Sequence, residues 1–314
     1  MKLQAYHKSI ASMTSHLDVT IVYEAGKEAV VEQLMEAAYA EANRLINIIS
    51  AWQEGTELYA VNQQAGIQAV KVCDELFYLI KRSLKISEWT KGLFDITFAS
   101  IDKVWFFDKP MNALPTKEAV AASVRHIDYR FIELNEADKT IFIRNKGTKI
   151  ELGAIGKGFI ANKMKSRLQA LGIHNGMVNA GGDLTAWGKS ESGETWRISI
   201  ADPEQKRDFI AWLPIQDSGI ATSGSYERYA LIEGKKYSHI IHPKTGMPVK
   251  GLLSVTVISP DIELCDALAT ALFLLGIEEG LAFINQFNDL QCFIVDEQQV
   301  YHYSDNLKQV YFNA

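Results

Sequence analysis

The chain has 314 residues, of which 47% are hydrophobic and 22% charged, a composition typical of a globular protein with one large α+β domain or about two smaller domains. Thirty-two basic and 38 acidic residues give a net charge of −6 and a pI near 5.7. No basic tract is present, which argues against nucleic acid as a partner. No apolar run approaches the roughly 18 residues that a membrane span needs, so no spanning segment is expected.

The three cysteines and the amino terminus carry little chemical signal. Cys73, Cys265 and Cys292 lie far apart among apolar neighbours and form no CxxC motif, so they are expected to be core residues. The opening segment MKLQAYHKSIASM lacks the apolar stretch of a signal peptide and has no cysteine for a lipid anchor. Location therefore stays open between the cytoplasm and, if an export signal has been removed, the periplasmic side of the cell envelope.

Hydrophobic periodicity gives the expected elements. In chain order they are a strand at 17–22, a helix at 27–49, a helix at 74–89, a helix at 117–124, strands at 131–134 and 140–144, a helix at 159–172, strands at 196–201, 209–214, 229–233 and 253–258, helices at 262–275 and 278–286, and a hairpin of 291–295 and 299–303. The buried stripes are expected to include Val30 in the first helix and Leu171 in the helix at 159–172.

The order of these elements favours one fold class. Helices come early and late and strands gather between them, which favours an α+β fold with a mainly antiparallel sheet over a βαβ arrangement. No internal repeat, heptad run or linker is evident, so residues 1–314 are expected to form a single domain.

Two glycine-containing segments are candidates for binding a ligand. The segment ELGAIGKG, residues 151–158, runs into the amphipathic helix, and a turn into a helix start presents backbone N–H groups that suit a phosphate, with Lys157 as a point charge. It matches neither a Walker A nor a GxGxxG motif, so a plain strand-to-helix turn is an equal alternative. The segment VNAGGD, residues 178–183, lets backbone approach a ligand through Gly181 and Gly182, or is a β-bulge.

Two later segments carry residues that could act chemically. In YSHIIHPKTG, residues 237–246, His239 stands at a strand end and is a candidate general base, with a structural histidine as the alternative. A metal pair with His242 is disfavoured, since residues three apart in a strand point to opposite faces. In CDALATA, residues 265–271, Asp266 and Thr270 share a helix face and suit Mg²⁺ together with substrate phosphates. A helix cap or a surface ion pair is the alternative for Asp266.

These four segments, in this order, resemble the ApbE family of FAD:protein FMN transferases. The matching stretches are ELGAIGKGF, VNAGGD, ATSGSYERY with YSHIIHPKTGMPV, and CDALATALFLLG. Weaker similarities are Met13-Thr14, the SAW stretch at 50–52 with Glu57 and Asn62, and GLFDIT at 92–97. The resemblance extends from about residue 13 to residue 303.

The resemblance implies a T-fold-related α+β architecture that binds FAD and Mg²⁺ in a cleft. It implies transfer of FMN from FAD to a threonine hydroxyl of an acceptor flavoprotein, with formation of a phosphoester and release of AMP. It names neither the acceptor protein nor an oligomeric state. Two alternatives remain: hydrolysis of FAD to FMN and AMP by the same Mg²⁺-dependent site, and flavin binding without turnover.

The resemblance also assigns roles to individual residues. The Mg²⁺ ligands would be the backbone carbonyl of Ala154 and the side chains of Asp266 and Thr270. Lys157 would contact the phosphates, Glu151 would lie beside the same ligand, and His239 would deprotonate the threonine. The positions that would line the FAD pocket are Met13, Trp52, Leu93, Phe94, Asp95 and Ile241.

The chain departs from the family pattern at three places. Glu151 stands where aspartate is commoner, His242 replaces the aspartate of the usual HIIDP turn, and Met13 lacks the glycine that normally follows it. The first departure leaves the reach of residue 151 open, whereas the second concerns a turn residue.

Overall fold

The computed structural model describes residues 2–13, 15–109, 111, 113–202, 209–225 and 229–307. Its centre is a sheet in which every neighbouring pair of strands is antiparallel. The strand order is β1-β2-β6-β7-β10-β13-β14-β15. The strands are β1 (Leu3–Ser12), β2 (Ser15–Glu24), β6 (Gly176–Ala180), β7 (Asp183–Trp187), β10 (Ser218–Gly224), β13 (Leu252–Ser259), β14 (Gln291–Asp296) and β15 (Tyr301–Tyr303). The predicted α+β class with a mainly antiparallel sheet is confirmed.

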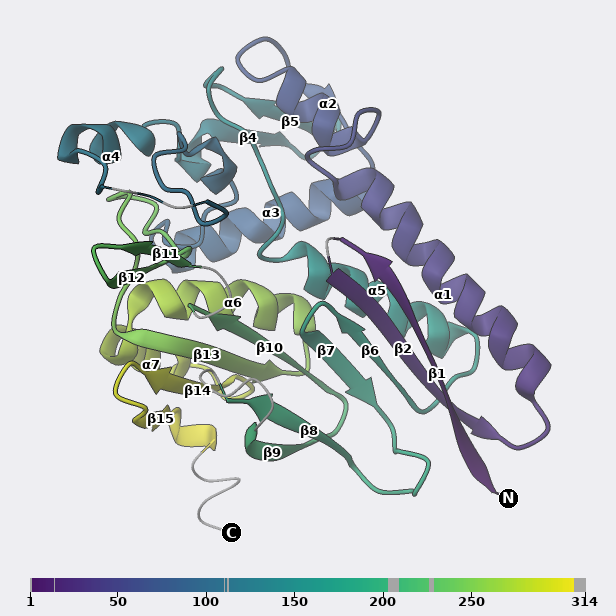
Figure 1. Cartoon of the computed structure of the whole chain (residues 1–314). Coiled ribbons are helices and arrows are strands. Elements are labelled where there is room, and N and C mark those ends of the chain that lie inside the picture. Colours follow the sequence, from purple (N-terminus) through teal and green to yellow (C-terminus); the bar gives the residue numbers. More distant parts are fainter. Residues whose placement is uncertain are drawn as a thin grey trace.

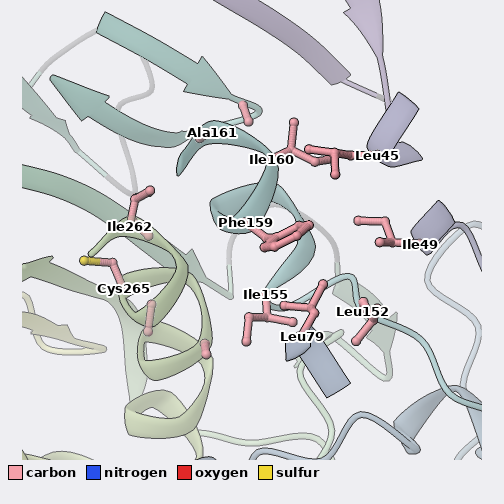
Figure 2. Close-up of a cluster of buried hydrophobic side chains, with 14 of the residues drawn as sticks. Leu45, Ile49, Leu79, Leu152, Ile155, Phe159, Ile160, Ala161, Ile262 and Cys265 are labelled. Carbon is pink, nitrogen blue, oxygen red and sulfur yellow. The ribbon is translucent and has the colours of Figure 1, made fainter. Parts of the chain in front are cut away.

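Three helices lie side by side across one face of this sheet (Figure 1): α1 (Glu28–Ile49), α5 (Gly156–Ala170) and α6 (Ile262–Leu275). Strand side chains alternate between faces, so Val255 and Val257 of β13 join the core beneath these helices. Figure 2 shows Phe159 of α5 facing Leu79, and Ile160 beside Leu45 of α1. The middle helix α5 is therefore held by apolar contacts with Leu45 of α1 and with Leu79.

The opposite face is covered by a hairpin of β8 (Trp196–Ala201) and β9 (Phe209–Ile215). Ile200 and Leu213 of this hairpin pack on Leu184 and Ile220 of the sheet in a second apolar cluster. The middle of the large sheet is thus covered on both faces, and every residue of β7 is buried, including the polar Asp183 and Thr185.

The remaining elements stand around the edge of this arrangement. They are α2 (Glu57–Gln63), α3 (Asp74–Trp89), α4 (Lys117–Ser123), α7 (Ile277–Ile284), the sheet β3 (Val70–Lys71), β5 (Thr140–Ile143) and β4 (Ile132–Asn135), and the hairpin β11 (Tyr229–Ile232) with β12 (Lys235–Ser238). The hairpin lies beside α4 in Figure 1, and the two share a third apolar cluster built around Trp105.

The start of α6 is fixed by a local signal. The Asp261 side chain accepts hydrogen bonds from the backbone N–H groups of Glu263 and Leu264, at 3.1 and 3.4 Å, as an N-cap residue does. The helix ends at Gly276, whose φ of +80° suits a residue without a side chain. Asp266 is therefore not the cap of its own helix.

Several expectations need correction. Val30 and Leu171 are exposed, because the buried stripe of α1 runs through Val31 and that of α5 ends at Leu168. The ATSGSY stretch at 221–226 was expected to be a small-residue loop, whereas residues 218–224 form strand β10; β1, α2, β3 and β7 were not expected either. Cys265 and Cys292 are buried as predicted, whereas Cys73 is only partly buried. None of the helices in the described ranges has the length and apolar character that a membrane crossing requires.

Candidate active site

One cavity of about 280 Å³ collects all four segments that the sequence singled out. Its wall comes from the stretch after α3, the turn before α5, the start of β7, the end of β10, the stretch after β12 and the middle of α6. The lining residues are Leu93, Phe94, Asp95, Ile96, Phe98, Glu151, Gly153, Ala154, Lys157, Asp183, Thr222, Ser223, Gly224, His239, Ile240, Ile241, Asp266, Thr270 and Leu274. Of the residues to which the resemblance assigns a role, Met13 and Trp52 are absent from this lining, and so are the candidate glycines Gly181 and Gly182.

The start of α5 is capped from another helix. Its N-cap position, Ile155, offers no side-chain acceptor, and the backbone N–H of Gly158 donates to Asp266 Oδ2 at 3.1 Å. This contact is possible because α5 and α6 touch at Gly158, where a Cβ would lie 2.5 Å from the carbonyl oxygen of Ile262. The helix start that was proposed as a phosphate site therefore already holds one carboxylate oxygen.

Lys157 lies between two carboxylates. Its ammonium group forms an ion pair with Asp183 and lies 3.9 Å from Asp266 Oδ1. Both aspartates are almost fully buried. Burial raises the pKa of Asp266, and the Lys157 charge and the Gly158 N–H group oppose that rise. A buried carboxylate such as that of Asp266 needs a nearby cation to stabilise its negative charge.

Asp183 is a site residue that the sequence reasoning missed. It is the last residue of the VNAGGD segment, in which only Gly181 and Gly182 were predicted to approach a ligand. Its place at the start of β7 aims the carboxylate at Lys157, 26 residues earlier in the chain. The sequence feature that could have indicated Asp183 is a carboxylate directly after two glycines.

The oxygen atoms near Asp266 suit a hard cation. Thr270 lies one helical turn further along α6, its hydroxyl 3.1 Å from that of Ser223, and Ala154 lines the same cavity. Carboxylate, hydroxyl and carbonyl oxygens are the ligands that Mg²⁺ prefers, usually alongside substrate phosphates. Within the described ranges no group of three or more His, Cys, Asp or Glu side chains could hold a metal ion alone. The residues present therefore fit a cation that the substrate helps to bind.

The two histidines of the YSHIIHPKTG segment are separated by the structure. His239 directly follows β12, lines the cavity, and meets the Phe107 ring edge-on with centroids 6.4 Å apart. His242 is outside the lining; its Nδ1 accepts the backbone N–H of Lys244 at 3.2 Å, and burial lowers its pKa. Of the two histidines, only His239 lines the cavity, and His242 belongs to the turn.

Two carboxylates at the cavity differ in how they are held. Asp95 accepts the N–H and O–H of Thr97 at 2.8 and 2.6 Å and the N–H of Tyr129 at 2.9 Å. Burial raises the pKa of both Asp95 and Glu151, and a hydrogen bond from Trp52 opposes the rise at Glu151. Asp95 therefore fixes the shape of its loop, while Glu151 faces the cavity.

Met13 and Trp52 lie outside the cavity. Met13 is at the turn between β1 and β2 with a φ of +49° and packs partly against the main core. Trp52 is 67% exposed, and its side chain forms a hydrogen bond with Glu151, which lines the cavity. Of the ATSGSYERY stretch, residues 226–228 lie outside the described ranges, as does Thr14 of the Met13-Thr14 pair.

Comparison with known proteins identifies the same family that the sequence motifs resemble. The model of the ApbE family matches residues 13–294. A protein of Treponema pallidum named FAD:protein FMN transferase is 30% identical over 297 residues, which cover 89% of this chain and 82% of that protein.

Solved structures agree with this match. The ApbE protein of Thermotoga maritima superposes with a TM-score of 0.85 at 28% identity and covers 98% of this chain and 99% of its own. The apo form of the flavinyl transferase ApbE of Pseudomonas stutzeri also gives a TM-score of 0.85, at 25% identity, with 99% and 98% covered.

Proposed function

This chain belongs to the ApbE family, and on that premise we propose that it is an FAD:protein FMN transferase that acts with Mg²⁺ on a threonine of an acceptor flavoprotein. One observation carries the proposal. Lys157, Asp266 and His239 come from three distant parts of the chain and line the same cavity of about 280 Å³. A cation binder, a phosphate partner and a candidate base are the groups that transfer from a pyrophosphate needs.

The proposed reaction balances with these groups. The threonine Oγ attacks the phosphorus on the FMN side of FAD, the bond from that phosphorus to the AMP oxygen breaks, and AMP leaves. The hydroxyl proton passes to His239, which is why an imidazole that titrates near neutral pH suits the position. The acceptor then carries FMN through a phosphoester.

The cavity lining carries one lysine and four carboxyl groups, Asp95, Glu151, Asp183 and Asp266, so a pyrophosphate would bind there together with a cation. Lys157 supplies a positive charge at the start of α5, and Asp183 holds its ammonium group in place. Asp266 and Thr270, with the carbonyl of Ala154, would hold Mg²⁺, which supplies charge neutralisation for the phosphates when bound. Asp266 is oriented for this role by the N–H of Gly158, so its position does not depend on the cation.

The size of the cavity indicates how FAD would lie. At about 280 Å³ it lies just below the usual volume of ligand pockets, roughly 300–1,000 Å³, and it is too small to enclose a whole dinucleotide. Part of FAD would therefore extend beyond the cavity, and the exposed Trp52 lies next to Glu151 of its lining. An aromatic ring at that place can stack on a flat ring of the ligand.

The test is a transfer assay. The protein is incubated with FAD, Mg²⁺ and a threonine-bearing flavoprotein acceptor, and mass spectrometry follows the acceptor while chromatography follows FAD, FMN and AMP. We expect FMN on the acceptor and an equal amount of AMP, with no product when Mg²⁺ is chelated. Free FMN and AMP without a modified acceptor would indicate an FAD pyrophosphatase. Bound but unconsumed FAD would indicate a flavin carrier.

A further inference from the structure

We propose that Asp183 is a positioning residue of the transferase site: it holds the Lys157 ammonium group away from Asp266 Oδ1, so that this oxygen stays available to Mg²⁺. The inference rests on the proposed function, because it concerns the metal that would act there. It gives a role to a buried carboxylate to which the family resemblance assigned none.

The position of Asp183 is set by the tight turn that joins β6 to β7. Asp183 pairs with Ala180 across the two strands. Between them lie Gly181 and Gly182, with φ values of +62° and +103°. A two-residue hairpin loop requires such left-handed conformations, and glycine adopts them without strain. The N–H of Gly182 also donates to Asn179 Oδ1 at 2.9 Å. The backbone that carries the Asp183 carboxylate is therefore fixed.

The Lys157 side chain runs past this turn to reach Asp183. A Cβ built on Gly181 would lie 3.5 Å from Lys157 Cδ, so the lysine stem passes beside the glycine backbone. The ammonium group then forms an ion pair with Asp183. Lys157 Nζ lies 3.9 Å from Asp266 Oδ1, which is too long for a hydrogen bond. The lysine is thus bound to one aspartate and stays out of hydrogen-bond range of the other.

The two aspartates compete for this ammonium group. Asp183 is 3% exposed and Asp266 5%, and a hydrogen bond links the two side chains. Carboxylates so close together and so deeply buried need a cation beside them. Asp266 Oδ2 accepts the N–H of Gly158, and Oδ1 is the oxygen 3.9 Å from Lys157 Nζ. A movement of the ammonium group by about 1 Å would make a hydrogen-bonded ion pair with Oδ1.

The ion pair with Asp183 therefore decides which cation Asp266 meets. Mg²⁺ binds oxygen ligands at about 2.0–2.1 Å, and an ammonium group hydrogen-bonded to the same oxygen would repel it. With a neutral side chain at position 183, the ammonium group would turn to Asp266, the buried carboxylate next to it. Asp183 thus keeps a metal ligand available by binding the cation that competes for it.

A double-mutant cycle on Asp183 and Lys157 tests this inference. Electron paramagnetic resonance measures binding of Mn²⁺, a substitute for Mg²⁺, to the protein without FAD. Flavin fluorescence measures how FAD affinity depends on the Mg²⁺ concentration. We expect Asp183→Asn to weaken metal binding by at least about tenfold, because the released ammonium group takes Oδ1. In the Lys157→Met background the same substitution should weaken it by no more than about threefold, because no ammonium group is left to compete.

A matched variant controls for the loss of a buried acidic charge. Asp296 on β14 is also buried and forms an ion pair, with His302 at 2.9 Å, and it is outside the cavity lining. Asp296→Asn changes the net charge equally and should leave metal binding unchanged. Urea unfolding shows whether each variant is folded. Asp183→Asn/Lys157→Met should be at least as stable as Asp183→Asn, because no ammonium group is left beside the neutral side chain.

The outcomes separate this inference from the proposed function. Equal weakening by Asp183→Asn in both backgrounds would overturn the inference, since Asp183 would then bind the metal itself or act only through its charge. Unchanged metal binding in Asp183→Asn, or an equal loss in Asp296→Asn, would also overturn it. The expected cycle without FMN transfer to a threonine acceptor would leave the positioning role standing and contradict the proposed function. Metal that binds to none of the proteins, with or without FAD, would contradict both.

Discussion

Gly158 is a tight contact between the two helices that carry the site, and its replacement by alanine tests the geometry directly. An alanine Cβ would lie 2.5 Å from the carbonyl oxygen of Ile262 and 2.7 Å from the Cα of Glu263, whereas ordinary contact begins near 3.4 Å. These are backbone atoms at the start of α6, so no side chain can rotate away. The helices must therefore separate by about 0.9 Å.

The expected magnitudes follow from that separation. Overpacking of a tight contact costs about 1–3 kcal/mol, and the better helix propensity of alanine returns up to about 1 kcal/mol. We expect Gly158→Ala to lower the free energy of unfolding by about 1–2 kcal/mol. The 3.1 Å bond from Gly158 N to Asp266 would lengthen toward 4 Å, beyond hydrogen-bond range. Misplacement of a site group by about 1 Å costs up to roughly 100-fold in rate, so transfer should fall by about 10- to 100-fold.

Gly156 provides a matched control in the same helical turn. A Cβ there would meet Ile49 Cδ1 at 3.2 Å, the end of a flexible side chain that can give way. Gly156→Ala should keep the free energy of unfolding within about 0.5 kcal/mol of the wild type and the rate within a few-fold. Urea unfolding and initial transfer rates measure both quantities. The reasoning fails if Gly158→Ala matches the wild type in both, or if the two variants are equally impaired.

Other predictions address the chemistry and the pH dependence. His239→Ala should slow transfer by about 10²–10⁴-fold in initial-rate assays while FAD affinity is retained, and His242→Ala should stay within a few-fold of the wild type; equal rates for both variants would remove the assignment of the base. Asp266→Asn keeps an oxygen for the Gly158 N–H but loses the anionic ligand, so a Mg²⁺ titration of the rate should show a requirement raised by about 10- to 100-fold; an unchanged titration curve would return Asp266 to a structural role. Burial raises the pKa of Glu263 from 4.5 to about 7. The charge of Arg82 only partly opposes this rise: Arg82 Nε lies 2.7 Å from Glu263 Oε1, but the two atoms are not aligned as a hydrogen bond. Between those pH values the folded protein keeps a proton that the unfolded chain has released, so the free energy of unfolding should fall by up to about 3 kcal/mol as pH rises through this window. In Glu263→Gln, urea unfolding across the same window should show no such fall; a fall as steep as that of the wild type would assign the pH dependence to another group.

The elements that the sequence predicted best are those with local signals. The bounds of α3 and α6 match the prediction because each has apolar residues at three-to-four spacing and a glycine shortly after its end, Gly92 and Gly276. Strand β10 was missed because its sequence, SGIATSG, has small residues and little alternation. Its extended form comes from pairing with β7 and β13 on either side, which no local pattern reports.

The site residues also fall into those with a local sequence signal and those whose role depends on tertiary contacts. The motif segments were predicted to act together, and the structure brings Lys157, Asp266 and His239 to one cavity. Asp183 was missed because its importance depends on the Lys157 ammonium, a contact made only after β7 and α5 have packed. The hydrogen bond from the Gly158 N–H to Asp266 could not be predicted either, since the two residues are 108 positions apart in the sequence.

The strand order of the large sheet has a consequence for how the protein is made. Strand β2 pairs with β6, so Leu17 can find its partner Ala180 only after the intervening residues have been made. In the same way, β10 can pair only after β13 has been made. Contacts so distant in sequence form slowly, because the loop between them must close before it is stabilised. A chain still on the ribosome would hold β1 and β2 as a two-stranded hairpin, and the edge of β2 that pairs with β6 would stay free until β6 emerges. The cavity needs α6 as well, so a nascent chain shorter than about residue 270 would have no place for FAD. Flavin can therefore bind only after nearly all of the fold has formed, and it cannot serve as a template for the earlier steps.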